Sequence, residues 1–387
     1  MRPEAAETSG YYWSYLPCQR EKMGLFRNLL RAKETPIKSN KDFWSWFQNN
    51  EKDFFKVIKS QGNIERDVFN KLSTQLNQLR DGYWFLVGMC DDNTAELILT
   101  ADGVCKNIVF VEELVSGAPV LDNWKFTALK PALNINDVYI SMGDLKFNKE
   151  NLFFYSNERS EYPDEVDITV VHSDYQEALK EPITNGVYIF MDNYLGELNS
   201  LTAIDNMQIV GTENANKELI PIEKLKDYLV WREKEFVEKY EGTRYDTVSD
   251  SYNSLEATLS NGKPLIAIIN SALLSWDSKA SHPWVVKVEI IYKGNENGMP
   301  DKQIYDLMNT FEDQLMLELK DSAGYLNIGR QTADGAREVY MACKDFRLPS
   351  TVLDRFQYDF RGRLNFDYVI YKDKYWRSFN QFRPEIN

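Results

Sequence analysis

Cationic and aromatic residues alternate near the C-terminal end of the chain, where they could bind an anionic polymer. Aromatic rings stack on unpaired bases, and lysine or arginine neutralises the phosphates between them. RNA binding is therefore one hypothesis for this surface, and packing of the same residues against other parts of the chain is the alternative. The candidate binding residues are Arg361, Arg363, Tyr371, Lys372, Lys374, Tyr375 and Trp376.

Histidine chemistry is limited, because His172 and His282 are the two histidines of the sequence. Neither stands in an HxxH, HExxH or HxH pattern, so a histidine-ligated metal would need ligands from distant segments. The sequence also lacks the GxSxG, P-loop and GxGxxG patterns. We therefore predict no catalytic residue, no metal and no cofactor. A hydrolase whose site is assembled from distant segments is kept as an alternative.

Carboxylates are abundant, with 59 aspartate and glutamate residues in the chain. Glu112 with Glu113, and Asp192 with Glu197, could form pairs for acid–base catalysis. This number of acidic residues also produces such pairs by chance. The acidic residues around positions 91–102 lack the spacing of an EF-hand calcium loop, so a solvated hairpin is expected there.

The candidate binding residues lie in a stretch whose hydrophobic pattern has the order β-α-β-β-α-β. Apolar residues recur at three- and four-residue steps after Pro300, which indicates an amphipathic helix, and Asp334-Gly335 is a hairpin turn. This order is typical of a ferredoxin-like unit, with two helices on one face of an antiparallel sheet. The predicted elements are strands 284–292, 325–330, 337–343 and 364–371, and helices 300–319 and 350–360.

Alternation along the strands predicts which side chains face the two helices. Leu326 and Ile328 are expected to face them, and Asn327 to lie on the opposite, open face. Glu289 and Asp367 are also expected on the open face, where their charges would disfavour RNA. We expect this face to pack against a hairpin at residues 255–269 or against upstream units.

Five motifs stand out in this stretch: His282-Pro-Trp-Val, Gly298-Met-Pro-Asp, Tyr325-Leu-Asn-Ile-Gly-Arg, Ala342-Cys-Lys-Asp-Phe and Tyr371-Lys-Asp-Lys-Tyr-Trp. Together they resemble a bacterial family known as domain of unknown function number 695, over roughly Val248 to Asn387. The upstream part resembles a region that accompanies this domain in Bacteroidetes-type proteins. The family has no established catalytic motif, and some relatives carry a neighbouring domain similar to ribonuclease E inhibitor B, which implies a regulatory role.

Upstream, the patterns predict an α+β protein of several units. An aromatic stripe including Phe43, Phe47 and Phe54 predicts a buried helix face. A strand is expected at 187–191 after an Asn-Gly turn, and a long helix at 221–240. Met23 is the expected biological start, with residues 1–22 as an upstream extension. The predicted units are 1–40 (a poorly ordered extension), 41–150 (α+β), 151–241 (α/β, ending in the long helix) and 248–387.

Charge and cysteine content limit the partners and the compartment. The net charge is −14, of which residues 1–281 carry −13, so general binding to nucleic acid is disfavoured, whereas a basic protein partner is permitted. Four cysteines without a CxxC pair indicate free thiols in a reducing cytoplasm. The sequence has no apolar run long enough to predict a membrane-spanning helix. We therefore predict a non-enzymatic, cytoplasmic protein that acts by protein binding, in a regulatory or inhibitor-like role, and leave its oligomeric state open.

Overall fold

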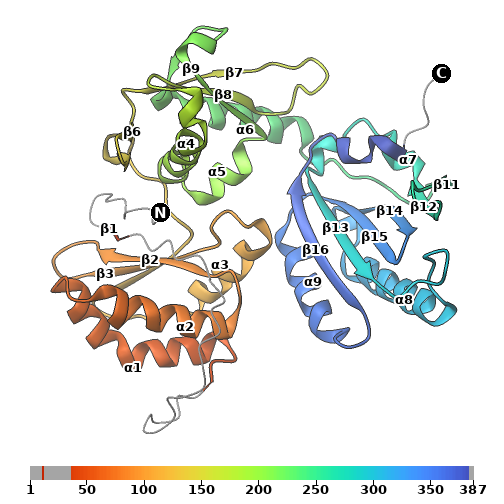
Figure 1. The fold of residues 1–387 in the computed structure, drawn as a ribbon, viewed down its shortest axis with the longest axis horizontal. Helices are drawn as coiled ribbons and strands as arrows, with labels where there is room; N and C mark the ends of the chain where they lie inside the picture. The colour runs from red at the N-terminus through yellow and green to blue at the C-terminus, as the bar shows by residue number, and fades with distance from the viewer. Residues whose placement is uncertain (1–10, 13–35, 383–387) are drawn as a thin grey trace. The chain divides into compact units, whose positions relative to one another are not determined.

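The computed structural model describes residues 11–12 and 36–382, which form two compact units (Figure 1). Unit 1 contains the described residues up to Ser156 together with Ile168–Asp227, and unit 2 contains Asn157–Asp167 together with the chain from Tyr228 onward. The expected start at Met23 and most of the predicted extension 1–40 lie outside the described residues. The part of the chain that is described is mixed helix and sheet, as the α+β prediction required.

The first part of unit 1 is a sheet of order β1-β2-β3-β4 with helices packed on it. The Oγ of Ser39 accepts a hydrogen bond from the Asp42 amide at 3.2 Å and so begins the first helix. The aromatic stripe of that helix is buried, as predicted. The elements are β1 (Tyr11–Tyr12), α1 (Asn40–Lys59), a π-helical turn (Glu65–Phe69), α2 (Asn70–Leu79), β2 (Trp84–Met89), β3 (Ala95–Thr100), α3 (Ile108–Ser116) and β4 (Trp124–Ala128).

The second part of unit 1 is a sheet of order β10-β7-β8-β9, with a separate β5–β6 hairpin. The helix predicted at 221–240 is present as α6, three residues of which belong to unit 1. The elements are β5 (Ile140–Met142), β6 (Leu145–Phe147), β7 (Leu152–Ser156), β8 (Asp167–His172), α4 (Lys180–Leu195), α5 (Glu197–Ala203), β9 (Asn206–Gly211), β10 (Ile220–Pro221) and α6 (Leu225–Tyr240).

The strand predicted at 187–191 is wrong, because these residues lie inside helix α4. Gly186 does not form a turn. It lies against the ring of Phe147, where a Cβ atom would clash. Val187 and Met191 are one helical turn apart and both are buried, so the apolar run is one face of a helix.

Unit 2 contains an antiparallel sheet of order β11-β12-β14-β15-β13-β16. The order β-α-β-β-α-β runs from β13 to β16, and the predicted upstream hairpin joins the sheet through β12. Asp334 (φ 44°) and Gly335 (φ 83°) are both left-handed, which suits a two-residue hairpin turn. The elements are β11 (Tyr252–Thr258), β12 (Pro264–Asn270), α7 (Ser271–Leu274), β13 (Trp284–Ile291), α8 (Lys302–Glu318), β14 (Tyr325–Ala333), β15 (Ala336–Cys343), α9 (Arg347–Asp359), β16 (Asn365–Lys372) and the 3₁₀ helix η9 (Arg377–Phe382).

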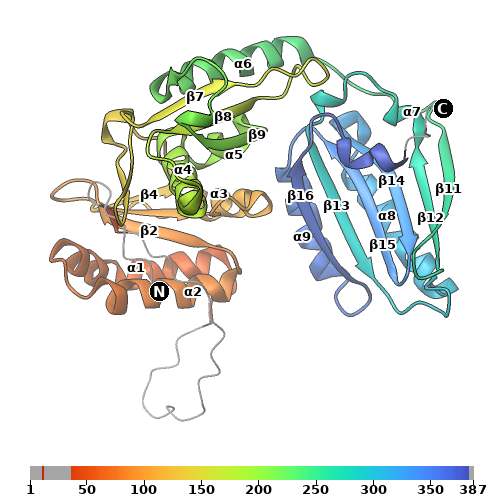
Figure 2. The ribbon, with the colours of Figure 1, turned by 45° about the horizontal axis from the view of Figure 1, so that its top comes forward.

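Helices α8 and α9 lie on one face of this sheet (Figure 2). The ring of Phe311 on α8 is 4.8 Å from that of Phe366 on β16 and 5.5 Å from that of Phe356 on α9. Both helices therefore share an aromatic core with the sheet. Among the helices of the described residues, none combines the length and the hydrophobicity that a membrane span requires.

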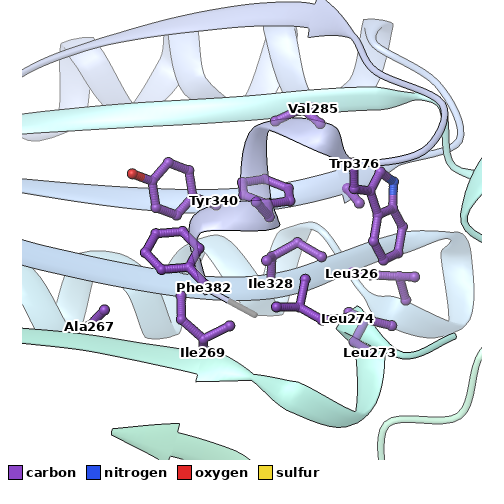
Figure 3. Close-up of a cluster of buried hydrophobic side chains, with 12 residues drawn as sticks. Ala267, Ile269, Leu273, Leu274, Val285, Leu326, Ile328, Tyr340, Trp376 and Phe382 are labelled. Atoms are coloured by element: carbon purple, nitrogen blue, oxygen red, sulfur yellow. The ribbon is translucent and has the colours of Figure 1, made fainter. Parts of the chain in front are cut away.

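The other face carries a second buried cluster, formed with η9 and α7 (Figure 3). The predicted orientation of β14 is wrong: Leu326 and Ile328 belong to this cluster, and Asn327 faces α8, with its Nδ2 3.1 Å from the Sδ of Met316. The register shifts between Asn327 and Gly329, and Leu326 pairs with Ala342, whose face it shares. Gly329 (φ 137°) is required at the irregularity, because a Cβ atom would clash with the neighbouring strand.

Candidate functional site

The candidate binding residues are divided by β16 into two groups. Arg361 and Arg363 precede the strand. Tyr371 and Lys372 are its last two residues, and Lys374, Tyr375 and Trp376 follow it. A strand of eight residues spans about 25 Å. The two groups therefore lie at opposite ends of the sheet and do not form one continuous surface.

Trp376 is an anchor of the core and is not available for stacking on a ligand. Its side chain is fully buried in the cluster of Figure 3, and its Nε1 donates to the carbonyl oxygen of His282 at 2.9 Å. The backbone at Trp376 is left-handed (φ 54°), which is uncommon for a residue other than glycine. The residues on either side of this turn contact residues 157–167, which we call the acidic segment.

Lys374 and Tyr375 bind Asp164 of the acidic segment. The Lys374 Nζ donates to the Asp164 carbonyl oxygen at 2.7 Å. The Tyr375 hydroxyl donates to the Asp164 Oδ2 at 2.5 Å, and the Asp164 amide donates to the same hydroxyl oxygen at 3.0 Å. Two adjacent residues therefore form hydrogen bonds with both the backbone and the side chain of one aspartate.

Helix α6 contributes a second set of contacts to the acidic segment. The Lys239 Nζ lies 2.7 Å and 3.0 Å from the two carboxylate oxygens of Asp164, and the Tyr240 hydroxyl donates to its Oδ2 at 2.8 Å. The Arg232 Nη2 donates to the carbonyl oxygen of Pro163 at 2.6 Å. Arg232 and Lys239 are seven residues apart, so they lie on one helix face, two turns from each other.

Arg377 binds the next acidic residue. Its Nη2 lies 2.9 Å from the Oε1 of Glu165, whose side chain is 3% exposed. Its guanidinium group also lies over the ring of Tyr162, 4.7 Å from the centroid, and that ring is 5.1 Å from the ring of Tyr375. We call the residues that hold the acidic segment the cationic site: Arg232, Lys239, Tyr240, Lys374, Tyr375 and Arg377.

The two ends of the acidic segment are joined to each other, because residues near its start contact Asp167 at its end. The Asn157 amide donates to the Asp167 carbonyl oxygen at 2.8 Å, and the Asn157 Nδ2 to the Asp167 Oδ1 at 2.9 Å. The Arg159 Nη2 lies 2.9 Å from the Oδ2 of Asp167. These contacts present Tyr162-Pro-Asp-Glu165 as a preformed loop.

The electrostatics of Asp164 follow from these contacts. Burial alone would raise the pKa of its carboxyl group, but hydrogen bonds from Lys239, Tyr375 and Tyr240 outweigh burial and lower the pKa below its ordinary value. Burial and the neighbouring carboxylate raise the pKa of Tyr375 and of Tyr240. Asp164 is therefore ionised and both tyrosines are neutral donors at neutral pH.

The histidines have structural partners. His282 is buried, and its Nδ1 lies 2.9 Å from the Oγ of Ser281. Burial, with a smaller effect of Lys344, lowers the pKa of His282 to about 4, so its ring is neutral near pH 7. The Nε2 of His172 lies 2.9 Å from the carbonyl oxygen of Lys146.

Asp192 and Glu197, one of the carboxylate pairs considered for acid–base catalysis, have different hydrogen-bond and ion-pair partners. Glu197 is buried and accepts hydrogen bonds from the Thr100 hydroxyl at 2.6 Å and the Ala101 amide at 3.1 Å, which ties α5 to β3. Burial raises the pKa of Asp192, and Lys130, 3.8 Å away, opposes that rise. Among residues 11–12 and 36–382, no group of three or more potential metal ligands is present.

The sequence places Lys374 and Tyr375 among the candidate binding residues, but it does not indicate the partners that they contact. Arg232, Lys239 and Tyr240 carry the i, i+7, i+8 spacing of one helix face, which was a usable signal. The acidic segment had no signal that linked it to residues more than two hundred positions away. Lys372 and Tyr371 lie at the end of β16, where the Tyr371 hydroxyl donates to the Oγ of Ser378 at 3.2 Å.

Residues 257–383 match a family described as "Family of unknown function (DUF695)". This match lies within the stretch from Val248 to Asn387 for which the motifs predicted it. No curated protein and no solved structure matches the chain.

Proposed function

We propose that this protein acts by binding protein, and that unit 2 binds a short acidic segment containing a tyrosine. Residues 162–165 are then a ligand supplied by the chain itself. One observation carries the proposal: the carboxylate of Asp164 is held by Lys239, Tyr240 and Tyr375 at 2.5–3.0 Å. The cationic site recognises backbone, carboxylates and an aromatic ring together, which is the chemistry of peptide recognition.

Further features support a protein partner over RNA. Tyr375 and Lys374, the residues suited to stacking and phosphate binding, are already engaged by Asp164. On the sheet, Glu289 pairs directly with Asp367 on one side and with Glu338 on the other. A row of carboxylates would repel a phosphodiester chain.

A regulatory, inhibitor-like role follows from a ligand carried in the same chain. A segment tethered to its site has an effective concentration in the millimolar range, so it competes with any partner that presents a similar sequence. Removing the segment would open the cationic site to that partner. We further propose a cytoplasmic location, and a ferredoxin-like classification for β13 to β16, whose strands have the order β14-β15-β13-β16.

The test uses the full-length chain with its own segment weakened by Asp164→Ala and Glu165→Ala. A labelled peptide of residues 157–167 is added, and binding is followed by fluorescence anisotropy. We expect the double variant to bind the peptide at least tenfold more tightly than the wild type, because the cis ligand no longer competes. Introducing Arg377→Gln into the double variant should remove most of its affinity for the peptide.

Two controls make the test specific. A peptide in which Asp164 and Glu165 are replaced by their amides should not bind, and Arg355→Gln, at an exposed arginine on α9, should leave binding unchanged. If the double variant binds neither peptide, or binds both peptides alike, the proposed recognition of acidic segments is refuted.

A further inference from the structure

A cavity of about 840 Å³ lies in unit 2 at the end of β16 opposite to the cationic site. Its walls are the last residues of β13, the beginning of α8, and the loop from α9 into β16. This volume is within the usual range for small-molecule pockets, about 300–1,000 Å³. None of the residues that hold the acidic segment contributes to it, so this inference does not depend on the proposed function.

Three cations line the cavity: Lys293, Arg361 and Arg363. Ile291 and Asn365 form the last pair between β13 and β16 on this side, and Lys293 and Arg363 each lie two residues beyond that pair, so both stand at the same end of the two strands. The Arg363 Nη2 donates to the carbonyl oxygen of Asp359 at 2.7 Å, and the Arg361 guanidinium lies 5.5 Å from the centroid of the Tyr358 ring.

None of these three cations has a carboxylate partner within the described residues. The only acidic residue of the lining is Asp301, whose Oδ1 accepts from the Ile304 amide at 2.9 Å and caps α8. The lining therefore carries a formal charge of about +2 from side chains. A dianion would neutralise it.

The remaining lining includes apolar side chains. Ile304, Leu364 and Phe366 form part of the wall, and Leu364 and Phe366 are nearly buried. A ligand that fills this cavity has an anionic group for the guanidinium forks and an apolar or ring-shaped body for the wall. Arginine binds the oxygens of a phosphate in pairs, which gives both affinity and orientation.

We propose that this cavity binds a small organic phosphate of the size and chemistry of a nucleoside diphosphate. A phosphodiester chain fits less well, because the strands that lead away from the cavity present Glu289 directly opposite Asp367. Those carboxylates would repel the next phosphates of a polymer, whereas a single small molecule does not reach them.

The proposal is tested by titrating the full-length chain with adenosine diphosphate in a calorimeter at low salt. Adenosine serves as the uncharged probe and inorganic pyrophosphate as the probe without a ring. We expect adenosine diphosphate to bind, adenosine not to bind, and pyrophosphate to bind at least tenfold more weakly than adenosine diphosphate. Arg361→Gln and Arg363→Gln should each lower the affinity for adenosine diphosphate about tenfold, since each removes charge-assisted hydrogen bonds.

Lys320→Gln is the matched control, because it removes one positive charge at the far end of α8 and lies outside the cavity. Its affinity should equal that of the wild type, and thermal unfolding should show that all three variants fold. Absence of binding overturns the proposal, as does equal weakening by all three variants. Equal affinity for pyrophosphate and adenosine diphosphate would overturn the assigned role of the apolar wall.

Discussion

Replacement of Asp164 by asparagine should loosen the acidic segment without disturbing the rest of unit 2. The carboxylate has three side-chain donors, and the variant keeps the shape of the residue but removes its charge. One amide NH₂ group would then face either Lys239 or the two tyrosine hydroxyls. The contact should weaken, whereas the hydrogen bonds at the base of the segment, around Asn157, should remain.

The expected magnitude follows from the exposure of the partners. The side chain of Lys239 is 51% exposed and that of Asp164 is 10% exposed, so their ion pair is screened and contributes at most about 1 kcal/mol. Hydrogen bonds to a charged group contribute about 1.5–3 kcal/mol, and asparagine retains part of them. We therefore expect docking of the segment to become less favourable by about 2 kcal/mol, which corresponds to about a thirtyfold larger population of the undocked segment.

Amide hydrogen exchange, read by mass spectrometry, measures this opening. The Asp164 amide donates to Tyr375, and the Glu165 amide donates to the Tyr162 carbonyl oxygen at 3.1 Å, so both should exchange about thirtyfold faster in the variant. Asp313→Asn, at an exposed aspartate on α8, is the matched control and should leave these rates unchanged. Equal exchange of residues 157–167 in the wild type and in Asp164→Asn would refute the reasoning.

The same pair of proteins gives a pH test. Because the folded protein lowers the pKa of Asp164, the contact is fully formed above the ordinary value of 3.8 and weakens as pH falls through the lower, folded pKa. The ratio of exchange rates between variant and wild type cancels the intrinsic pH dependence of exchange. This ratio should therefore be constant above pH 5 or thereabouts and approach one below 3.8. A constant ratio throughout the acid range would contradict the assignment.

Three further predictions concern the sheet and its surroundings, each measured as the free energy of unfolding in urea. Glu289→Lys should stabilise by about 0.5–1 kcal/mol, because Glu289 lies directly opposite Asp367, and a loss of stability would count against this. Gly329→Ala (φ 137°) should destabilise the protein by about 3 kcal/mol, because a Cβ atom there would clash with the backbone of Ile268. The control Gly262→Ala (φ 81°, with open space around it) should destabilise by only about 1 kcal/mol. Equal destabilisation would show that the close approach of the Ile268 backbone is unimportant. Because the pKa of His282 is about 4 in the folded state and 6.5 ordinarily, the unfolded state binds the proton first, and stability should fall by up to about 3 kcal/mol between pH 6.5 and 4. His282→Gln should lack that slope, and an unchanged slope would disprove the assignment.

Much of unit 2 could be predicted from local pattern. The turn at Asp334-Gly335, the amphipathic helix after Pro300 and the order β-α-β-β-α-β are all present. These features depend on residues close in sequence, for which side-chain periodicity and turn chemistry are direct signals. The facing of β14 was not predictable in this way, because one irregularity next to Gly329 reverses the alternation of the strand.

The candidate site was predicted only in part, for a related reason. Composition singled out Lys374 and Tyr375, but it also grouped them with Arg361 and Arg363, at the other end of β16, and with Trp376, which is buried. A run of similar residues along the chain says nothing about which end of a strand, or which side of a turn, each residue occupies.

Local patterns in the sequence were sufficient to predict the secondary structure of the C-terminal part, the acidic charge of the first 281 residues and the residue types that could bind an anion. The folded chain was needed to reveal that Tyr375 contacts Asp164, 211 positions earlier in the chain, and that the two groups of cations are separate. Helices and strands follow from interactions between near neighbours, whereas a binding site depends on contacts between distant segments. Such contacts are set by the packing of the whole unit, and no local pattern records them.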